Sequence, residues 1–188
     1  MIILKKIYPN FEPAHELLAC FNDQGNPIEP RPREVVHTKP YTIWHGVSNV
    51  WLLNNRGDIL CSKRSNLVSG NPNKWQTYFG GHVKAGSDFL KTAQEELNEE
   101  IGLNVPDNDL NLVESGQRED IMHLYKMYAI LFNDSISKLK FTDGEVVVAK
   151  WFRFNDYQKM KKFHPDQWCN GMGEEQYNKA LQQLNIIL

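Results

Sequence analysis

Cysteine is scarce in this chain, and the cysteines that occur follow no metal-binding pattern. The 188 residues include three, Cys20, Cys61 and Cys169, and none of them stands in a CxxC pair or beside a histidine. Three isolated cysteines exclude a small scaffold held by disulfides and a zinc site built on thiolates. The sequence therefore favours reduced thiols, which are typical of a cytoplasmic protein.

Long apolar runs and an excess of charge of one sign are also missing. No stretch approaches the ~20 apolar residues that a membrane-spanning helix needs. The first six residues place apolar side chains before lysines, the reverse of a secretory signal. Lysine and arginine total 21 against 23 acids, a net charge of −2, so nothing attracts the whole molecule to nucleic acid or an anionic membrane. We expect neither as a partner.

The composition is that of an ordinary globular protein, with 41% hydrophobic and 23% charged residues. A chain of this length can bury roughly 70% of its unfolded surface without cross-links. We expect one globular domain, residues 41–188, with an N-terminal arm, residues 1–40, packed on it. The proline-rich stretch 28–32 is excluded from a central strand and predicts an edge segment or hairpin arm beside a strand at 16–22.

Strand and helix patterns alternate along the rest of the chain. The nearly continuous apolar run from His45 to Leu53 is typical of a strand buried on both faces, and a turn leads into a return strand, Ile59–Arg64. The remaining predictions are strands at 2–8, 75–83, 123–132 and 145–154, helices at 87–101 and 174–184, and loops at 65–74 and 107–118. This order predicts an α/β fold with helices on the faces of a mixed sheet.

The most informative segment is the second half of the helix expected over Ser87–Ile101. Glu96, Glu99 and Glu100 stand at i, i+3 and i+4, which places three carboxylates on one helix face. Gly80 and Gly81 end the preceding strand, Ser87 is the expected N-cap, and Gly102 ends the helix. Carboxylate oxygens are the ligands that hard divalent cations prefer. A solvated acidic face is the alternative interpretation.

These residues resemble the signature of the Nudix hydrolases. Gly81 begins the signature, and the run from Glu96 to Leu103 completes it in register. Ser87 and Glu95 depart from it, because the family has glutamate and arginine there. The resemblance implies an α/β/α sandwich around a mixed sheet, a Mg²⁺ or Mn²⁺ cofactor, and hydrolysis of a diphosphate linkage in a small nucleoside diphosphate derivative or related compound.

The resemblance also implies site residues. The metal ligands are Glu96, Glu99, Glu100 and the carbonyl of Gly81. The general base toward the attacking water is one of these glutamates or Glu145, and the choice stays open. Candidate substrate-binding residues are the basic pair that ends the second core strand, two aromatic residues before the glycines, and a histidine after them: Arg64, Lys63, Trp75, Phe79 and His82. Arg118, expected on a loop, is a weaker candidate.

Two other functions stay open. Residues 16–26, 37–50 and 54–64 are similar to the branch that contains type I isopentenyl diphosphate isomerase, within a likeness that covers roughly residues 14–155. His37, His45 and His82 match positions of metal-binding histidines there. That isomerase needs a cysteine immediately before the Gly-His pair, where this chain has Gly80. A binding module without turnover is favoured by the departures at Ser87 and Glu95, although clustered carboxylates without a cation are costly. A homodimer is an open alternative to a monomer.

Overall fold

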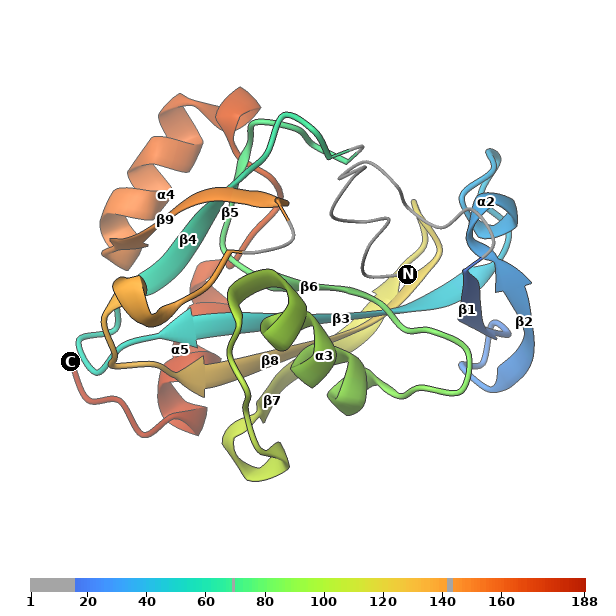
Figure 1. Ribbon diagram of the computed structural model, residues 1–188, viewed down its shortest axis with the longest axis horizontal. Helices are drawn as coiled ribbons and strands as arrows, with labels where there is room; N and C mark the ends of the chain where they lie inside the picture. The colour runs from blue at the N-terminus through green and yellow to red at the C-terminus, as the bar shows by residue number, and fades with distance from the viewer. Residues whose placement is uncertain (1–15, 69, 142–143) are drawn as a thin grey trace.

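The computed structural model describes residues 16–68, 70–141 and 144–188. Its centre is strand β3 (Trp44–Leu53), which is hydrogen-bonded to four other strands. The neighbours β1 (Leu17–Phe21), β4 (Ile59–Arg64) and β6 (Phe79–His82) run antiparallel to it, and β8 (His123–Leu131) runs parallel. The predicted mixed sheet is therefore confirmed (Figure 1).

The remaining strands extend the sheet outward. Strand β7 (Asn111–Arg118) pairs with β8, whereas β5 (Trp75–Gln76) and β9 (Val146–Phe152) both pair with β4. Strand β2 (Pro27–Pro32) pairs with β1 alone among the described strands. The prolines of β2 lack an N–H donor and are confined to such an edge, as the sequence predicted. The strand expected at 2–8 lies outside the described residues.

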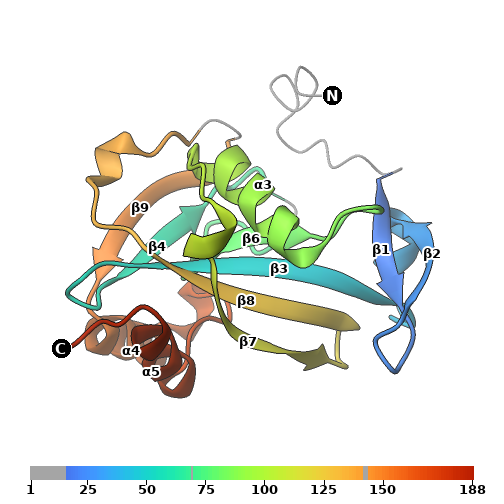
Figure 2. The ribbon, with the colours of Figure 1, turned by 90° about the horizontal axis from the view of Figure 1, so that it is seen from below.

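Helices cover both faces of the sheet. Helix α3 (Phe89–Ile101) packs on one face, and α4 (Phe154–Phe163) and α5 (Glu174–Gln183) pack on the other (Figure 2). Short turns complete the fold: α2 (Arg33–Val36), η1 (Asp107–Asp109), η2 (Ile136–Lys138) and η3 (Pro165–Gln167). The layers form the expected α/β/α sandwich. Within the described part of the chain, each helix is too short or too polar to cross a lipid bilayer.

Two apolar cores lie on opposite faces of β3, because successive side chains of a strand point to opposite sides. On the α3 side, Val50 and Leu52 pack with Phe79, Leu97 and Ile101, all fully buried. The core on the other side contains Trp51, Leu53, Met127, Tyr157, Trp168 and Met172. This burial on both faces explains why the sequence of β3 is a nearly continuous apolar run.

Three local predictions were wrong. The N-cap of α3 is Asp88, not Ser87: Asp88 has an extended backbone, and its carboxylate accepts a 2.9 Å hydrogen bond from the N–H of Lys91. The strand expected at 75–83 is interrupted between β5 and β6. Residues 111–118 are strand β7 rather than loop, because β8 supplies hydrogen-bond partners that a polar sequence does not reveal.

Helix α4 was missed because its sequence from Phe154 to Phe163 is mostly polar and its register offers a narrow apolar stripe. Within it, Tyr157 is fully buried. The end of α3 was predicted correctly. Gly102 follows the helix and has a left-handed backbone conformation, with a φ of 68°, which glycine adopts without strain.

Replacing Leu97 with alanine should loosen α3 from the sheet. Leu97 is fully buried between α3 and β3, so we expect a loss of about 2–5 kcal/mol in the free energy of unfolding, measured by urea denaturation. The matched control is Leu112→Ala on β7, whose side chain is 45% exposed. Equal losses for the two variants would contradict this account of the core.

Candidate functional site

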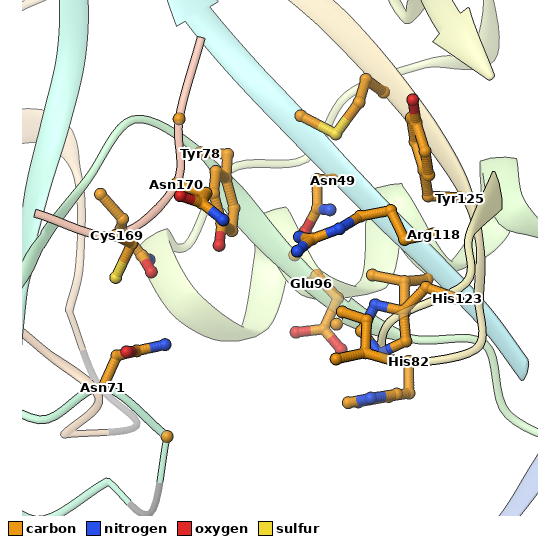
Figure 3. A pocket seen from close by; sticks show the side chains of 18 of the residues that line it. Asn49, Asn71, Tyr78, His82, Glu96, Arg118, His123, Tyr125, Cys169 and Asn170 are labelled. Carbon is orange, nitrogen blue, oxygen red and sulfur yellow. The ribbon is translucent and has the colours of Figure 1, made fainter. Parts of the chain in front are cut away.

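A pocket of about 1320 Å³ opens beside β3 and β6. Its walls come from segments far apart in the sequence: strands β3, β6, β7 and β8, helix α3, and the chain between α4 and α5. Figure 3 shows His82 and His123 on one side, Tyr78 and Asn170 on the other, and Asn49, Glu96 and Arg118 between them. The pocket collects most of the site residues that the sequence predicted.

The paired glycines of β6 allow a close approach from both faces of the sheet. A Cβ at Gly81 would collide with the carboxylate of Glu96, which reaches over the strand from α3. A Cβ at Gly80, whose φ is 152°, would collide with the Ser48 carbonyl and lie 2.7 Å from Oδ1 of Asn49. Only glycine fits at position 80, because a side chain there would collide with backbone. At position 81 a side chain would push the Glu96 carboxylate away from the strand.

The three helix glutamates occupy different environments. Glu96 and Glu99 line the pocket. Glu100 is 4% exposed, and its Oε1 accepts a 3.2 Å hydrogen bond from the N–H of Gly80. Oε1 of Glu99 lies 3.9 Å from Nζ of Lys84. The donor set and the cradle over Gly81 fit a hard divalent cation such as Mg²⁺.

Some of the basic and acidic residues predicted for the site line the pocket, and others do not. Arg64 and Glu145 line the pocket, whereas Lys63 does not. The guanidinium of Arg64 is held in place, with Nε donating to the Gly70 carbonyl at 2.8 Å and Nη1 donating to Oε1 of Gln76 at 3.0 Å. Arg118, the last residue of β7, also lines the pocket and forms a 3.2 Å ion pair with Asp120.

The two aromatic residues that the sequence offered for substrate binding lie outside the pocket. Phe79 is completely buried in the core on the α3 side. The Trp75 ring packs against Phe152 and Trp168, with ring centroids 5.5 and 5.9 Å apart. Neither residue belongs to the lining of the pocket. Their apolar character serves packing, and we do not include them in the proposed substrate site.

Four histidines meet at the end of the pocket near α2. Ligand atoms of His37, His45 and His82 lie within 4.8 Å of one another, and Nε2 of His37 lies 3.1 Å from Nε2 of His82. The ring of His123 is 4.6 Å from that of His45. The sequence did not single out His123, because its placement depends on the parallel register that pairs it with His45.

Burial favours the neutral form of three of these histidines. It lowers the pKa of His45 to about 4 and that of His123 to about 3, and it lowers the pKa of His82 well below its usual value. Nε2 of His45 is buried and has no hydrogen-bond partner among the residues the structure describes. Neutral imidazoles in this arrangement are chemically suited to bind a transition metal.

Several other residues of the pocket were not predicted from the sequence. Asn49, Tyr78, Tyr125, Met127 and Asn170 reach it from two strands, β3 and β8, from the β5–β6 connection and from the segment after η3. No local pattern marks them. Their convergence depends on strand pairing and on how the C-terminal segment returns to the sheet.

Comparison with known proteins identifies a family from the sequence and a matching fold from the structure. Residues 44–169 match the model of the NUDIX domain. An isopentenyl-diphosphate Delta-isomerase of Paenarthrobacter aurescens is 34% identical over 88 residues, which is 45% of this chain and 47% of that protein. An uncharacterized Nudix hydrolase of Pseudomonas aeruginosa is 30% identical over 88 residues, 47% of this chain and 51% of that protein. The chain spans about half the length of the curated relatives it matches.

Among solved structures, DR0079 of Deinococcus radiodurans has the same fold, with a TM-score of 0.69, 18% identity, and coverage of 88% of this chain and 99% of that one. The domain match covers more than half of the chain and includes β3, the glycine pair and α3. This chain therefore belongs to the Nudix family.

Proposed function

We propose that this protein is a divalent-metal-dependent hydrolase that cleaves a diphosphate linkage in a small molecule, a nucleoside diphosphate derivative or related compound. The observation that carries the proposal is the close approach of the Glu96 carboxylate over Gly81, at the edge of a pocket large enough for such a substrate. This approach places acidic side chains of α3 beside Gly81, which has no side chain to block them.

The glutamates of α3 would hold Mg²⁺ or Mn²⁺, together with the Gly81 carbonyl. When bound, such a cation would neutralise negative charge on the diphosphate and so favour attack of water on a phosphorus atom. Glu100 is buried and accepts the Gly80 N–H, which suits a ligand held in place more than a base exposed to water. We therefore assign removal of the proton from the attacking water to Glu99 or Glu145, which both line the pocket.

Basic side chains around the pocket would bind the phosphates. Those that line it are Arg33, Arg64, Lys74, Lys84 and Arg118. Arg64 is well suited to this role, because its guanidinium is already fixed by Gly70 and Gln76 and loses little freedom on binding. Lys63 does not line the pocket, and we leave it out of the proposed contacts.

The other expectations follow the same proposal. We infer a cytoplasmic enzyme that acts on a small molecule and takes neither nucleic acid nor membrane as a partner. The division into an arm, residues 1–40, and a domain, residues 41–188, stays a prediction, as does a homodimer. In the structure β1 and β2 continue the same sheet as β3, so the described part of the arm is integral to the fold.

Isomerase chemistry is a second candidate, favoured by the histidine cluster. The relative from Paenarthrobacter aurescens carries the name of an isopentenyl-diphosphate Delta-isomerase. Gly80 stands where that enzyme's cysteine is expected, and it has no room for a side chain beside Ser48. Without an acid at this position the proton transfer loses a partner, so hydrolysis is the better supported function. A binding module without turnover would retain the metal site and release no product.

Replacing Glu99 with glutamine should abolish hydrolysis while leaving the fold intact. Removal of a metal ligand or a general base costs roughly 100-fold or more in rate. The measurement is product release, followed by chromatography, from nucleoside di- and triphosphates, nucleotide sugars, dinucleotides and isopentenyl diphosphate with Mg²⁺ or Mn²⁺, and with EDTA in parallel.

Glu95→Gln on the same helix is the matched control for Glu99→Gln. Glu95 forms an exposed pair with Lys91 at 3.9 Å and should be replaceable with little effect. Undiminished hydrolysis by the Glu99 variant would contradict the proposed site. Conversion of isopentenyl diphosphate to its isomer would support the second candidate instead.

Replacing Gly81 with alanine should reduce both stability and metal affinity. The new methyl group would occupy the position of the Glu96 carboxylate, and such overpacking costs about 1–3 kcal/mol. Urea denaturation measures the stability, and titration with Mn²⁺ followed by electron paramagnetic resonance measures the affinity.

The control for Gly81→Ala uses the same substitution in a Glu96→Ala background. There the carboxylate is gone, so the added methyl group should cost little further stability. An equal cost in both backgrounds would show that the collision between the two groups is not the cause.

A further inference from the structure

The segment between β6 and α3 holds Lys84 in a fixed position beside the N-terminal arm. This segment runs past β1 (Figure 2) and is hydrogen-bonded to it on both sides of Lys84. The N–H of Ala19 donates to the Val83 carbonyl at 2.8 Å. The N–H of Ala85 donates to the Leu17 carbonyl, also at 2.8 Å. The backbone of Lys84 is therefore fixed against β1, which limits where its side chain can reach.

The ammonium of Lys84 lies between two carboxylates from distant parts of the chain. Its Nζ is 3.8 Å from Oε1 of Glu16, which precedes β1, and 3.9 Å from Oε1 of Glu99 on α3. All three residues line the pocket. Both distances allow an ion pair but exceed the length of a hydrogen bond. The ammonium is therefore shared, and a small movement brings it onto either carboxylate.

The carboxylate of Glu16 is held in place to receive this charge. Its Oε2 accepts a 3.3 Å hydrogen bond from Nη1 of Arg33, and the N–H of Arg33 donates to the Glu16 carbonyl at 2.8 Å. The side chain of Glu16 is 15% exposed, whereas that of Glu99 is 43% exposed. Glu16 is thus the less solvated of the two partners and belongs to the arm, not to α3.

The partners of Lys84 distinguish it from a basic side chain that awaits a phosphate. Arg64 is held by two neutral acceptors, the Gly70 carbonyl and the Gln76 side chain, so its charge stays available to an anion. The charge of Lys84 is balanced by carboxylates, and one of these, Glu99, belongs to the proposed metal-binding set. A divalent cation on Glu99 and the ammonium would repel each other. Lys84 therefore affects the site before any phosphate arrives.

We propose that Lys84 is a positioning residue of the metal site, which competes with the divalent cation for Glu99 and moves onto Glu16 when the cation binds. Without the cation, Lys84 balances the charge of Glu99 and keeps that carboxylate beside the pocket. Through Glu16 and Arg33, the described part of the arm then sets how tightly the cation is held. The assignment rests on the proposed function, which makes Glu99 a metal ligand.

The test measures the dissociation constant of Mn²⁺ for the whole chain by electron paramagnetic resonance. Only Mn²⁺ that excess Mg²⁺ displaces is counted, because Mg²⁺ selects oxygen ligands over the imidazoles of the histidine cluster. Lys84→Met removes the charge and keeps the length of the side chain. It should lower the dissociation constant roughly three- to tenfold, since the cation no longer meets a positive charge.

Two further variants separate charge from structure. Lys84→Arg keeps the charge and should bind Mn²⁺ as the unchanged chain does. Glu16→Gln removes the carboxylate that receives the ammonium, so it should raise the dissociation constant roughly threefold. The same change should matter less in a Lys84→Met background. A purely structural role predicts the opposite sign for Lys84→Met, namely weaker Mn²⁺ binding together with a lower free energy of unfolding in urea.

Lys91→Met is the matched control for Lys84→Met. Nζ of Lys91 lies 3.9 Å from Oε1 of Glu95, the same separation as between Lys84 and Glu99, but neither residue of this pair lines the pocket. Its loss should leave Mn²⁺ binding unchanged. If Glu16→Gln fails to fold, as judged by urea denaturation, the different responses of Lys84→Met and Lys84→Arg decide the question.

Unchanged or weaker Mn²⁺ binding by Lys84→Met would overturn the role of Lys84, and so would an equal gain in Lys91→Met. Glu99→Gln tests the metal site separately and should lose the Mn²⁺ that Mg²⁺ displaces. If Glu99→Gln binds Mn²⁺ as tightly as the unchanged chain, the metal site and the role of Lys84 both fail. If the Lys84 variants respond as expected but no diphosphate is hydrolysed, only the proposed function fails.

Discussion

The contact between the Glu96 carboxylate and the bare backbone of Gly81 links the parts of the site. This contact requires β6 to pair with β3 in a register that points Gly81 toward α3. It also requires α3 to pack closely against the sheet. Ser48 contributes to that position, because its hydroxyl donates a 2.6 Å hydrogen bond to the carbonyl of Phe89 in the first turn of the helix. The apolar packing of Leu97 and Ile101 holds the rest of α3 in place.

Strand β3 divides the molecule into a structural face and a binding face. Ser48, Val50 and Leu52 face α3, where they fix the helix that carries the acids. The alternating residues Val47, Asn49 and Trp51 line the pocket. The two glycines of β6 follow the same alternation, since Gly81 pairs with Ser48 and Gly80 pairs with Asn49. A slip of one residue would exchange the two sets and destroy both the core and the site.

Local signals predicted much of the fold and part of the site. Apolar runs located β3, β4 and β8, and the spacing of Glu96, Glu99 and Glu100 located the acidic helix, because these features depend on neighbours in the sequence. Strand β7 and helix α4 depend on partners far along the chain, and their polar sequences conceal them. The same reason hid His123 and Asn170: one reaches the pocket through parallel strand pairing and the other through a segment anchored to Thr77 and Tyr157.

The two departures from the Nudix signature can be understood from the start of α3. Local bonds stand where the family has a glutamate and an arginine: Asp88 caps the helix, and Ser87 Oγ lies 3.5 Å from Oγ1 of Thr92. Glu95, in the position of the arginine, pairs with Lys91 on the exposed side of the helix instead of reaching back to the loop. Because the cap satisfies a backbone N–H that would otherwise lack a partner, the helix begins at a defined residue without that glutamate and arginine. The glutamates that follow therefore keep their register against Gly81, and the altered signature is compatible with the proposed metal site.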